Sequence, residues 1–255
     1  MEAFQFLKTK PMTAEPTLGR TMMLDKGLGL NAVDDLIATA GEDISFAKFG
    51  WGTTATMDRE LILAKTHKYN AAGIMPYPGG TLLEIAAATG QYDEFLAEAD
   101  ALGFKGIEVS DGSTQIDHQK RQQLITQARD AGFFVISEVG KKNPKLDHEL
   151  TTRERMTTIA ADLAAGSNYV IIEAREAGKN IGIYDAQGQI VDDELAAITT
   201  HGIDHLIFEA PLKAQQVALI LKFGPQVNLG NIASDEVTAL ATLRYGLRGD
   251  TVGRV

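Results

Sequence analysis

The sequence predicts a single-domain α/β protein, residues 1–255, folded as a (β/α)8 barrel (TIM barrel). Short apolar runs alternate with amphipathic stretches of helical period, and there are eight such strand–helix units. The 255 residues also match the length of about 250 that this fold typically uses. An open doubly wound sheet is the alternative, but no Gly-x-Gly-x-x-Gly follows the first strand.

The first half of the chain contains four predicted units, which follow a lead-in segment of residues 1–20. Each strand is a short apolar or β-branched run, and each helix has its apolar residues spaced along one face. Asn31 is expected to cap the first helix, and Gly41 follows its end. The strands and helices pair as Thr21–Leu24 with Asn31–Ala40, Ile44–Phe49 with Asp58–Tyr69, Gly73–Pro76 with Tyr92–Leu102, and Gly106–Val109 with Gln119–Ala131.

The second half repeats the alternation in four more units, and no linker or shift in composition separates the halves. Its strands and helices pair as Phe133–Ser137 with Thr152–Ala165, Tyr169–Glu173 with Asp192–Thr200, His205–Phe208 with Lys213–Phe223, and Val227–Leu229 with Asp235–Tyr245.

Composition excludes several classes of protein. The chain has no cysteine, which rules out disulfides, zinc–thiolate sites, iron–sulfur clusters and cysteine nucleophiles. Its net charge of −10, without a basic stripe, argues against nucleic-acid binding. No apolar run approaches the roughly 18–20 residues that cross a bilayer, and no signal-peptide pattern is visible. We therefore expect a cytoplasmic protein without nucleic-acid or membrane partners.

Charged side chains follow nearly every predicted strand, at the barrel end where this fold places its active sites. The carboxylates that could hold a hard cation, most simply Mg²⁺, are Asp25, Asp111, Glu138, Glu173 and Glu209. The cationic groups that could bind an anion or donate a proton are Lys26, Lys48, Lys141, Lys142 and Arg175. Structural ion pairs are the alternative interpretation of these charges.

Histidine is missing from the carboxyl ends of the predicted strands, which disfavours a histidine base, a Ser-His-Asp triad or a histidine-rich metal site. The five histidines fall on helices, in flanking loops or at a strand start, and they are His67, His118, His148, His201 and His205.

A cationic barrel mouth in an acidic protein predicts a small anionic substrate. Gly79 and Gly80 follow the third strand, and their N–H groups could approach an anion closely, although they could also form only a turn. Asn228, Gly230 and Asn231 surround the end of the eighth strand, where such barrels often bind phosphate. Trp51 is expected to pack on the rim.

Nine segments, most of them at predicted strand ends, carry distinctive motifs. They are Leu24–Gly29, Lys48–Thr53, Pro78–Leu82, Ile107–Gly112, Ser137–Lys142, Arg175–Lys179, Phe208–Pro211, Val227–Ile232 and Gly246–Thr251. Taken together and in this order, they resemble the phosphosulfolactate synthase family over nearly the whole chain.

The resemblance implies a (β/α)8 barrel that adds sulfite to phosphoenolpyruvate in a Mg²⁺-dependent reaction. The product is (2R)-phospho-3-sulfolactate, the enzyme class is that of the carbon–sulfur lyases, and in methanogens the reaction begins a route to coenzyme M. It also implies that a lysine after the fifth strand protonates an enediolate. We favour Lys142, with Lys141 as the alternative, and expect neighbouring lysines to lower its pKa.

For Mg²⁺, we favour Glu138, Glu173 and Glu209 over Asp25 and Asp111. The phosphate is expected to bind Gly230 and Asn231 together with Arg175 or Arg248, while Lys26 and Lys48 neutralise the carboxylate or sulfite. The chain departs from the family at Ala174 and Ala177, where glycine and serine are usual. Loss of that serine hydroxyl bears on the details of substrate binding.

Two other functions remain open, and both keep the barrel. A buried lysine could form a Schiff base in an aldolase-type enzyme. Alternatively, a stress-associated homologue could have kept the fold without activity, although a scaffold would not need the charged strand ends. We expect a homo-oligomer of unspecified size.

Overall fold

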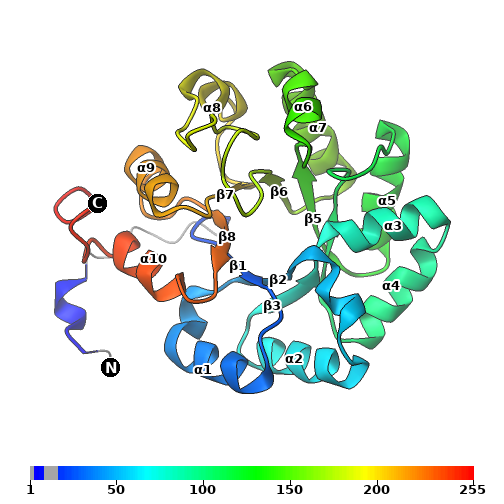
Figure 1. The fold of residues 1–255 in the computed structure, drawn as a ribbon, viewed down its shortest axis with the longest axis horizontal. Helices are drawn as coiled ribbons and strands as arrows, with labels where there is room; N and C mark the ends of the chain where they lie inside the picture. The colour runs from blue at the N-terminus through cyan, green and yellow to red at the C-terminus, as the bar shows by residue number, and fades with distance from the viewer. Residues whose placement is uncertain (1–2, 9–16) are drawn as a thin grey trace.

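The structure is a computed structural model that describes residues 3–8 and 17–255. Residues 1–2 and 9–16 of the predicted lead-in segment lie outside the described residues. Eight parallel strands form a nearly closed barrel surrounded by helices (Figure 1), which confirms the predicted (β/α)8 fold. The N-terminal turn Gln5–Leu7 lies near the C-terminal segment, and the Lys8 Nζ is 4.1 Å from the centroid of the Tyr245 ring.

All eight predicted strands are present, with shifted ends. Their bounds are β1 Thr21–Asp25, β2 Phe46–Phe49, β3 Met75–Pro78, β4 Gly106–Val109, β5 Phe134–Val139, β6 Tyr169–Ile172, β7 Leu206–Glu209 and β8 Leu229–Ala233. Five strands, β5 and β7 among them, run further toward their carboxyl ends than predicted, so Glu138 and Glu209 lie within strands rather than after them. Their side chains are therefore fixed by the sheet.

A seam between β3 and β4 interrupts the sheet. Hydrogen-bonded neighbours follow the order β3-β2-β1-β8-β7-β6-β5-β4, so no ladder joins β3 to β4 within residues 17–255. Met75 and Gly79 donate their N–H groups toward β2. Because backbone groups alternate between the two sides of a strand, the backbone nitrogens of residues 76 and 78 face β4. Both residues are prolines, which have no N–H to donate. The Lys105 N–H donates to the Pro76 oxygen at 3.2 Å and bridges the seam.

The helices include two that were not predicted, α3 and α6. Their bounds are α1 Leu30–Ala40, α2 Arg59–Ala71, α3 Gly80–Thr89, α4 Tyr92–Ala101, α5 His118–Asp130, α6 Pro144–Glu149, α7 Thr152–Ala165, α8 Asp192–Ile198, α9 Lys213–Phe223 and α10 Val237–Arg244. The predicted cap at Asn31 is wrong, because Gly29 occupies the N-cap position. In the described parts of the chain, none of these helices has the length and apolar character needed to cross a membrane.

The interior of the barrel is divided along its axis. Its lower layer is apolar and consists of Met22, Phe46, Tyr77, Ile136, Tyr169, Ile171 and Ile207. Two residues further along β2 and β5, the same inward face carries Lys48 and Glu138, because side chains alternate with a period of two. A larger apolar layer lies between the sheet and the helices. Inside the barrel, as far as the structure describes it, buried charge therefore lies toward the carboxyl ends of the strands.

Candidate active site

A buried glutamate cluster occupies the mouth of the barrel. Its members are Glu108 of β4, Glu138 of β5, Glu173 directly after β6 and Glu209 of β7, all at most 1% exposed. Lys48 of β2 lies at the centre of this cluster. Its Nζ is 2.9 Å from Glu108 Oε2, 3.1 Å from Glu138 Oε2 and 3.4 Å from Glu209 Oε1. One lysine thus links carboxylates from three strands.

Three members of the cluster are arranged so that they could hold a metal ion. One carboxylate oxygen each from Glu138, Glu173 and Glu209 lies within 4.8 Å of the other two. Glu138 Oε1 and Glu173 Oε2 are buried and accept no hydrogen bond. Unpaired buried carboxylate oxygens are costly unless a cation or a donor meets them. The three glutamates therefore fit a hard, oxygen-preferring cation such as Mg²⁺.

The pKa values of the cluster show how strongly its members interact. Burial raises the pKa of Glu173 well above its usual value, and the charges of Glu138 and Glu209 raise it further. Burial also favours a higher pKa for Glu138, but the positive charges of Lys48 and Lys142 outweigh this and hold that pKa far below its usual range. Without a cation, the cluster therefore keeps Glu138 ionised and favours a proton on Glu173.

Lys141 and Lys142 follow β5 and point in different directions. Lys142 Nζ donates to Thr81 Oγ1 at 3.3 Å and lies 3.6 Å from Glu138 Oε1, so it faces the mouth. Lys141 Nζ donates to the Asp111 carbonyl oxygen at 2.8 Å and forms an ion pair with the Asp111 carboxylate. Of the two lysines, only Lys142 lies beside the glutamate cluster.

The pKa of Lys142 is raised rather than lowered. Burial alone lowers the pKa of this lysine, but the nearby charges of Glu138 and Glu173 more than compensate. The charge of Lys48 does lower the pKa of Lys142, as expected of a neighbouring lysine, but Lys141 faces away and the carboxylates outweigh the effect of Lys48. The same balance raises the pKa of Lys48 well above its usual value.

The rim of the mouth carries groups that can meet an anion. Arg175 has a φ of 59° and directs its N–H to Glu173 Oε1 at 2.6 Å and Glu209 Oε2 at 2.9 Å. Its guanidinium, 41% exposed, lies over the cavity together with Asn231, whose buried Oδ1 has no hydrogen-bond partner. The Lys26 Nζ lies 5.1 Å from the centroid of the Trp51 ring.

The structure separates two predicted metal ligands from the cluster. Asp25 points outward from β1, where Lys65 Nζ is 2.9 Å from its Oδ2 and the Tyr69 hydroxyl donates to the same oxygen. Asp111 pairs with Arg121 at 3.1 Å and with Lys141 outside the mouth. Both carboxylates are satisfied by these partners and contribute no oxygen to the metal-binding arrangement.

The predicted anion-binding residues divide similarly. Asn228 lies at the amino end of β8, where its amide donates to the carbonyl oxygens of Thr17 and Leu206. Arg248 pairs with Asp250 at 3.5 Å, away from the mouth. These two residues are therefore not positioned to bind a substrate at the mouth.

The glycines serve the scaffold. The Gly79 N–H donates to the Phe49 oxygen, and the Gly80 N–H donates to Glu108 Oε1 at 2.6 Å, so neither is free for an anion. A Cβ on Gly230 would lie 2.4 Å from Met22 Cε, so this glycine permits close packing inside the barrel.

Sequence reasoning missed Glu108 and Glu84. Glu108 lies within the predicted fourth strand rather than after it, and its alternation with Gly106 and Ser110 places it on the inner face. Glu84, buried on the unpredicted helix α3, accepts hydrogen bonds from Ser110 Oγ and the Ser113 N–H. It thereby fixes the loop after β4 beside Lys142.

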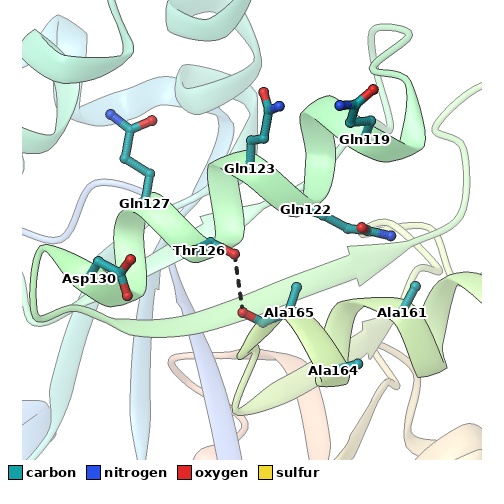
Figure 2. A pocket seen from close by; sticks show the side chains of 9 residues that line it. All are labelled: Gln119, Gln122, Gln123, Thr126, Gln127, Asp130, Ala161, Ala164 and Ala165. Carbon is teal, nitrogen blue, oxygen red and sulfur yellow. Dashed lines mark hydrogen bonds between the residues drawn. The ribbon is translucent and has the colours of Figure 1, made fainter.

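Another surface hollow lies away from the mouth, between α5 and α7 on the outside of the barrel (Figure 2). It has a volume of about 700 Å³ and is lined by glutamines of α5 and alanines of α7. Asp130 is its only ionisable group among the described residues. Without a nucleophile, a base or a cation site, this groove offers no chemistry comparable with that of the mouth.

Comparison with known proteins identifies relatives over the whole chain. The family model for (2R)-phospho-3-sulfolactate synthase (ComA) matches residues 10–250. The chain is 50% identical over 256 residues to the phosphosulfolactate synthase of Methanocaldococcus jannaschii, with 100% of both chains covered. It is 38% identical over 240 residues to the phosphosulfolactate synthase of Bacillus subtilis, covering 91% of this chain and 92% of that one.

Solved structures match in fold. Phosphonopyruvate hydrolase in complex with oxalate and Mg²⁺ superposes with a TM-score of 0.58 at 17% identity, covering 88% of this chain and 78% of that chain. The 3-hexulose-6-phosphate synthase of Salmonella typhimurium gives 0.56 at 14% identity, covering 92% and 94%. At these low identities, the solved structures show only that the barrel fold is shared. The family is shown by the family model and by the sequence relatives. The chain belongs to the phosphosulfolactate synthase family.

Proposed function

We propose that the protein catalyses the Mg²⁺-dependent addition of sulfite to phosphoenolpyruvate, giving (2R)-phospho-3-sulfolactate, as expected of a carbon–sulfur lyase. The observation that carries this proposal is the placement of Lys142 beside three glutamates whose oxygens can hold a cation. Membership of the phosphosulfolactate synthase family supports this choice of substrates.

Glu138, Glu173 and Glu209 would hold the Mg²⁺. Bound there, the ion supplies positive charge that stabilises the negative charge developing on the substrate carboxylate. Lys48 keeps the glutamates in place through its contacts with Glu108, Glu138 and Glu209. The raised pKa of Lys48 keeps this lysine protonated, and the three carboxylates around its Nζ hold it as a fixed counter-charge.

Lys142 is the proposed proton donor. The sulfur lone pair of sulfite forms the new bond to C3 of phosphoenolpyruvate, and the C2–C3 π electrons move onto C2 and the carboxylate. The Lys142 ammonium then transfers a proton to C2, which creates the stereocentre, while the phosphate ester stays intact. The Lys142 side chain is 28% exposed, so the resulting amine can recover a proton from water.

The anionic groups of the substrates would meet the cations of the rim. Arg175 offers its exposed guanidinium, and Asn231, which lines the same cavity, offers its side-chain NH2 group as a donor. Neither contact moves a proton, so these residues bind and orient the substrate.

An aldolase-type Schiff base is less compatible with this site. Such a mechanism needs an unprotonated lysine, whereas the carboxylates raise the pKa of both Lys48 and Lys142. A scaffold without activity would likewise have no use for a buried cluster whose charges are unbalanced.

The decisive experiment mixes the purified protein with phosphoenolpyruvate and sulfite, with Mg²⁺ or with EDTA, and follows phosphorus and proton NMR. The expected result is a new phosphate ester and loss of the vinyl protons, without free phosphate, in the Mg²⁺ sample. No reaction with any divalent metal would refute the substrate assignment. Turnover that persists in EDTA would refute the metal requirement.

A further inference from the structure

Trp51 occupies a position at the mouth that core packing does not explain. It is the chain's only tryptophan, it lies in the 3₁₀ segment Gly50–Thr56 after β2, and 54% of it is exposed. Its φ of 54° lies in the left-handed region, which bulky residues rarely adopt. Strained backbone at an exposed position recurs at functional sites, where it places a side chain for a task other than packing.

The indole instead contacts a cation from a neighbouring loop. The Nζ of Lys26, which follows β1, lies 5.1 Å from the Trp51 ring centroid, within the range of a cation–π interaction. Lys26 is exposed, and within the described residues no carboxylate lies in salt-bridge range of it. The ring holds the ammonium in place and leaves its charge available to an anion.

The charge at the mouth makes this cation useful. Five carboxylates line the cavity with three cationic groups, and these residues are Glu108, Glu138, Glu173, Glu176, Glu209, Lys48, Lys142 and Arg175. A divalent cation would only balance this excess of negative charge. An anionic substrate needs further positive charge at the entrance, and Lys26, held by an indole that lines the same cavity, supplies it.

We propose that Trp51 is a positioning residue: its indole holds the Lys26 ammonium at the mouth, where that ammonium binds an anionic group of the substrate. The inference rests on the proposed function and deepens it, because it names the part of the site that captures phosphoenolpyruvate before the chemical step. Trp51 then acts through Lys26, and its removal affects substrate affinity more than turnover.

Fluorescence tests the binding step without turnover. The single tryptophan is titrated with phosphoenolpyruvate in the presence of Mg²⁺ and without sulfite. The expected result is a saturable change in Trp51 emission, and in Lys26→Met the affinity falls by about tenfold, as for the loss of one charge-assisted contact. Unchanged affinity in Lys26→Met would overturn the proposal.

Steady-state kinetics test the role of the ring. Trp51→Ala should raise the KM for phosphoenolpyruvate by about five- to tenfold and change kcat by less than about twofold, and Trp51→Phe should keep part of the affinity. Ile85→Ala is the matched control, since Ile85 on α3 is 53% exposed and does not line the cavity. Its KM should equal that of the wild type.

The outcomes separate this inference from the proposed function. If the wild type converts phosphoenolpyruvate and sulfite but the Trp51 variants keep its KM, the inference fails alone. If the wild type shows no turnover, the proposed function fails, and the fluorescence titration still tests capture of the anion. A lowered Tm with an unchanged KM would assign Trp51 a structural role, and Trp51→Phe with Lys26→Met decide the matter if Trp51→Ala does not fold.

Discussion

The barrel buries charge in two regions that are constructed differently. Between the strands and the helices, buried charges form close pairs of opposite sign, such as Asp25 with Lys65 at 2.9 Å and Arg121 with Asp162 at 2.6 Å. At the mouth, the four members of the glutamate cluster share two lysines. Ion pairs with equal and opposite charges stabilise the scaffold, whereas a cluster with excess negative charge attracts a cation. The same residue types therefore serve stability in one region and function in the other.

The largest expected effect on activity comes from replacing Lys142, the lysine whose side chain faces the mouth. Lys142→Met should lower kcat by about 10²–10⁴-fold, because the proposed proton donor is lost. Steady-state assays measure this, with circular dichroism as a check on the fold. Lys141→Met is the matched control, since the neighbouring lysine is bound to Asp111, and it should keep kcat within about tenfold of the wild type. A reversed ranking of the two variants would transfer the donor role to Lys141.

Breaking a balanced pair should affect stability instead. Arg121→Met leaves Asp162 buried without a counter-charge, and we expect a loss of about 3–5 kcal/mol in the free energy of unfolding. Urea denaturation measures this loss. Lys222→Met breaks an exposed pair with Asp192 and should cost less than about 1 kcal/mol. Equal losses in the two variants would contradict the distinction between buried and surface pairs.

The unbalanced cluster should make Mg²⁺ binding depend on pH. Because the pKa of Glu173 is raised, Mg²⁺ must displace a proton, and its affinity should fall by up to about tenfold per unit as pH drops below that pKa. Calorimetry in buffers of different ionisation enthalpy measures the released proton. Glu173→Gln should abolish the release, and a wild type that binds Mg²⁺ without releasing a proton would argue against Glu173 as a ligand.

The raised pKa of Glu173 affects folding stability and Mg²⁺ affinity in opposite directions as the pH rises. A raised pKa in the fold means that Glu173 favours the metal-free fold below its unfolded pKa of about 4.3, and this contribution is lost as the pH rises toward the folded pKa. Glu138, whose pKa is lowered, contributes stability above its unfolded pKa and loses it as the pH falls. Removal of Mg²⁺ should therefore lower Tm more at pH 8 than at pH 5.

The smallest effect concerns the path of Lys142 into the mouth. A Cβ on Gly112 would lie 3.2 Å from Lys142 Cγ and 3.4 Å from Glu138 Oε1. Gly112→Ala should therefore displace the lysine slightly and lower kcat by about 2–10-fold with little change in Tm. Gly249→Ala, where nothing lies within 4 Å of the added Cβ, is the control. Equal kcat values for the two variants would show that this contact is relaxed at no cost.

The sequence predicted the barrel well because alternation and length are properties of whole segments. The site depends on single residues, since a shift of one position moves a side chain to the other face of a strand. Asp25 and Glu209 each end a strand, yet Asp25 faces Lys65 outside and Glu209 faces the mouth. Hydrophobic patterns alone do not fix that choice, because both faces of these strands are buried.

The resemblance of motifs added what periodicity could not, since it singled out Glu138, Glu173 and Glu209, which the structure brings together. It assigned no role to Glu108, although the motif Ile107–Gly112 contains this residue, and that role follows only from the place of Glu108 on the inner face of β4. It also did not separate Lys141 from Lys142. That distinction depends on the loop after β5, where the Lys142 N–H donates to the Gly112 oxygen at 2.9 Å and the two side chains leave on opposite sides.

The prolines of β3 leave the strands unpaired between β3 and β4, and this gap does not coincide with the ends of the chain. New termini between α4 and β4, within residues 102–105, would let a circularly permuted chain start with β4 and finish with α4, with every hydrogen-bonded strand pair kept. Lys8 already lies over Tyr245, so a short linker could join the original ends. The chain therefore begins and ends at one place in the barrel, whereas the break in strand pairing lies at another, between β3 and β4.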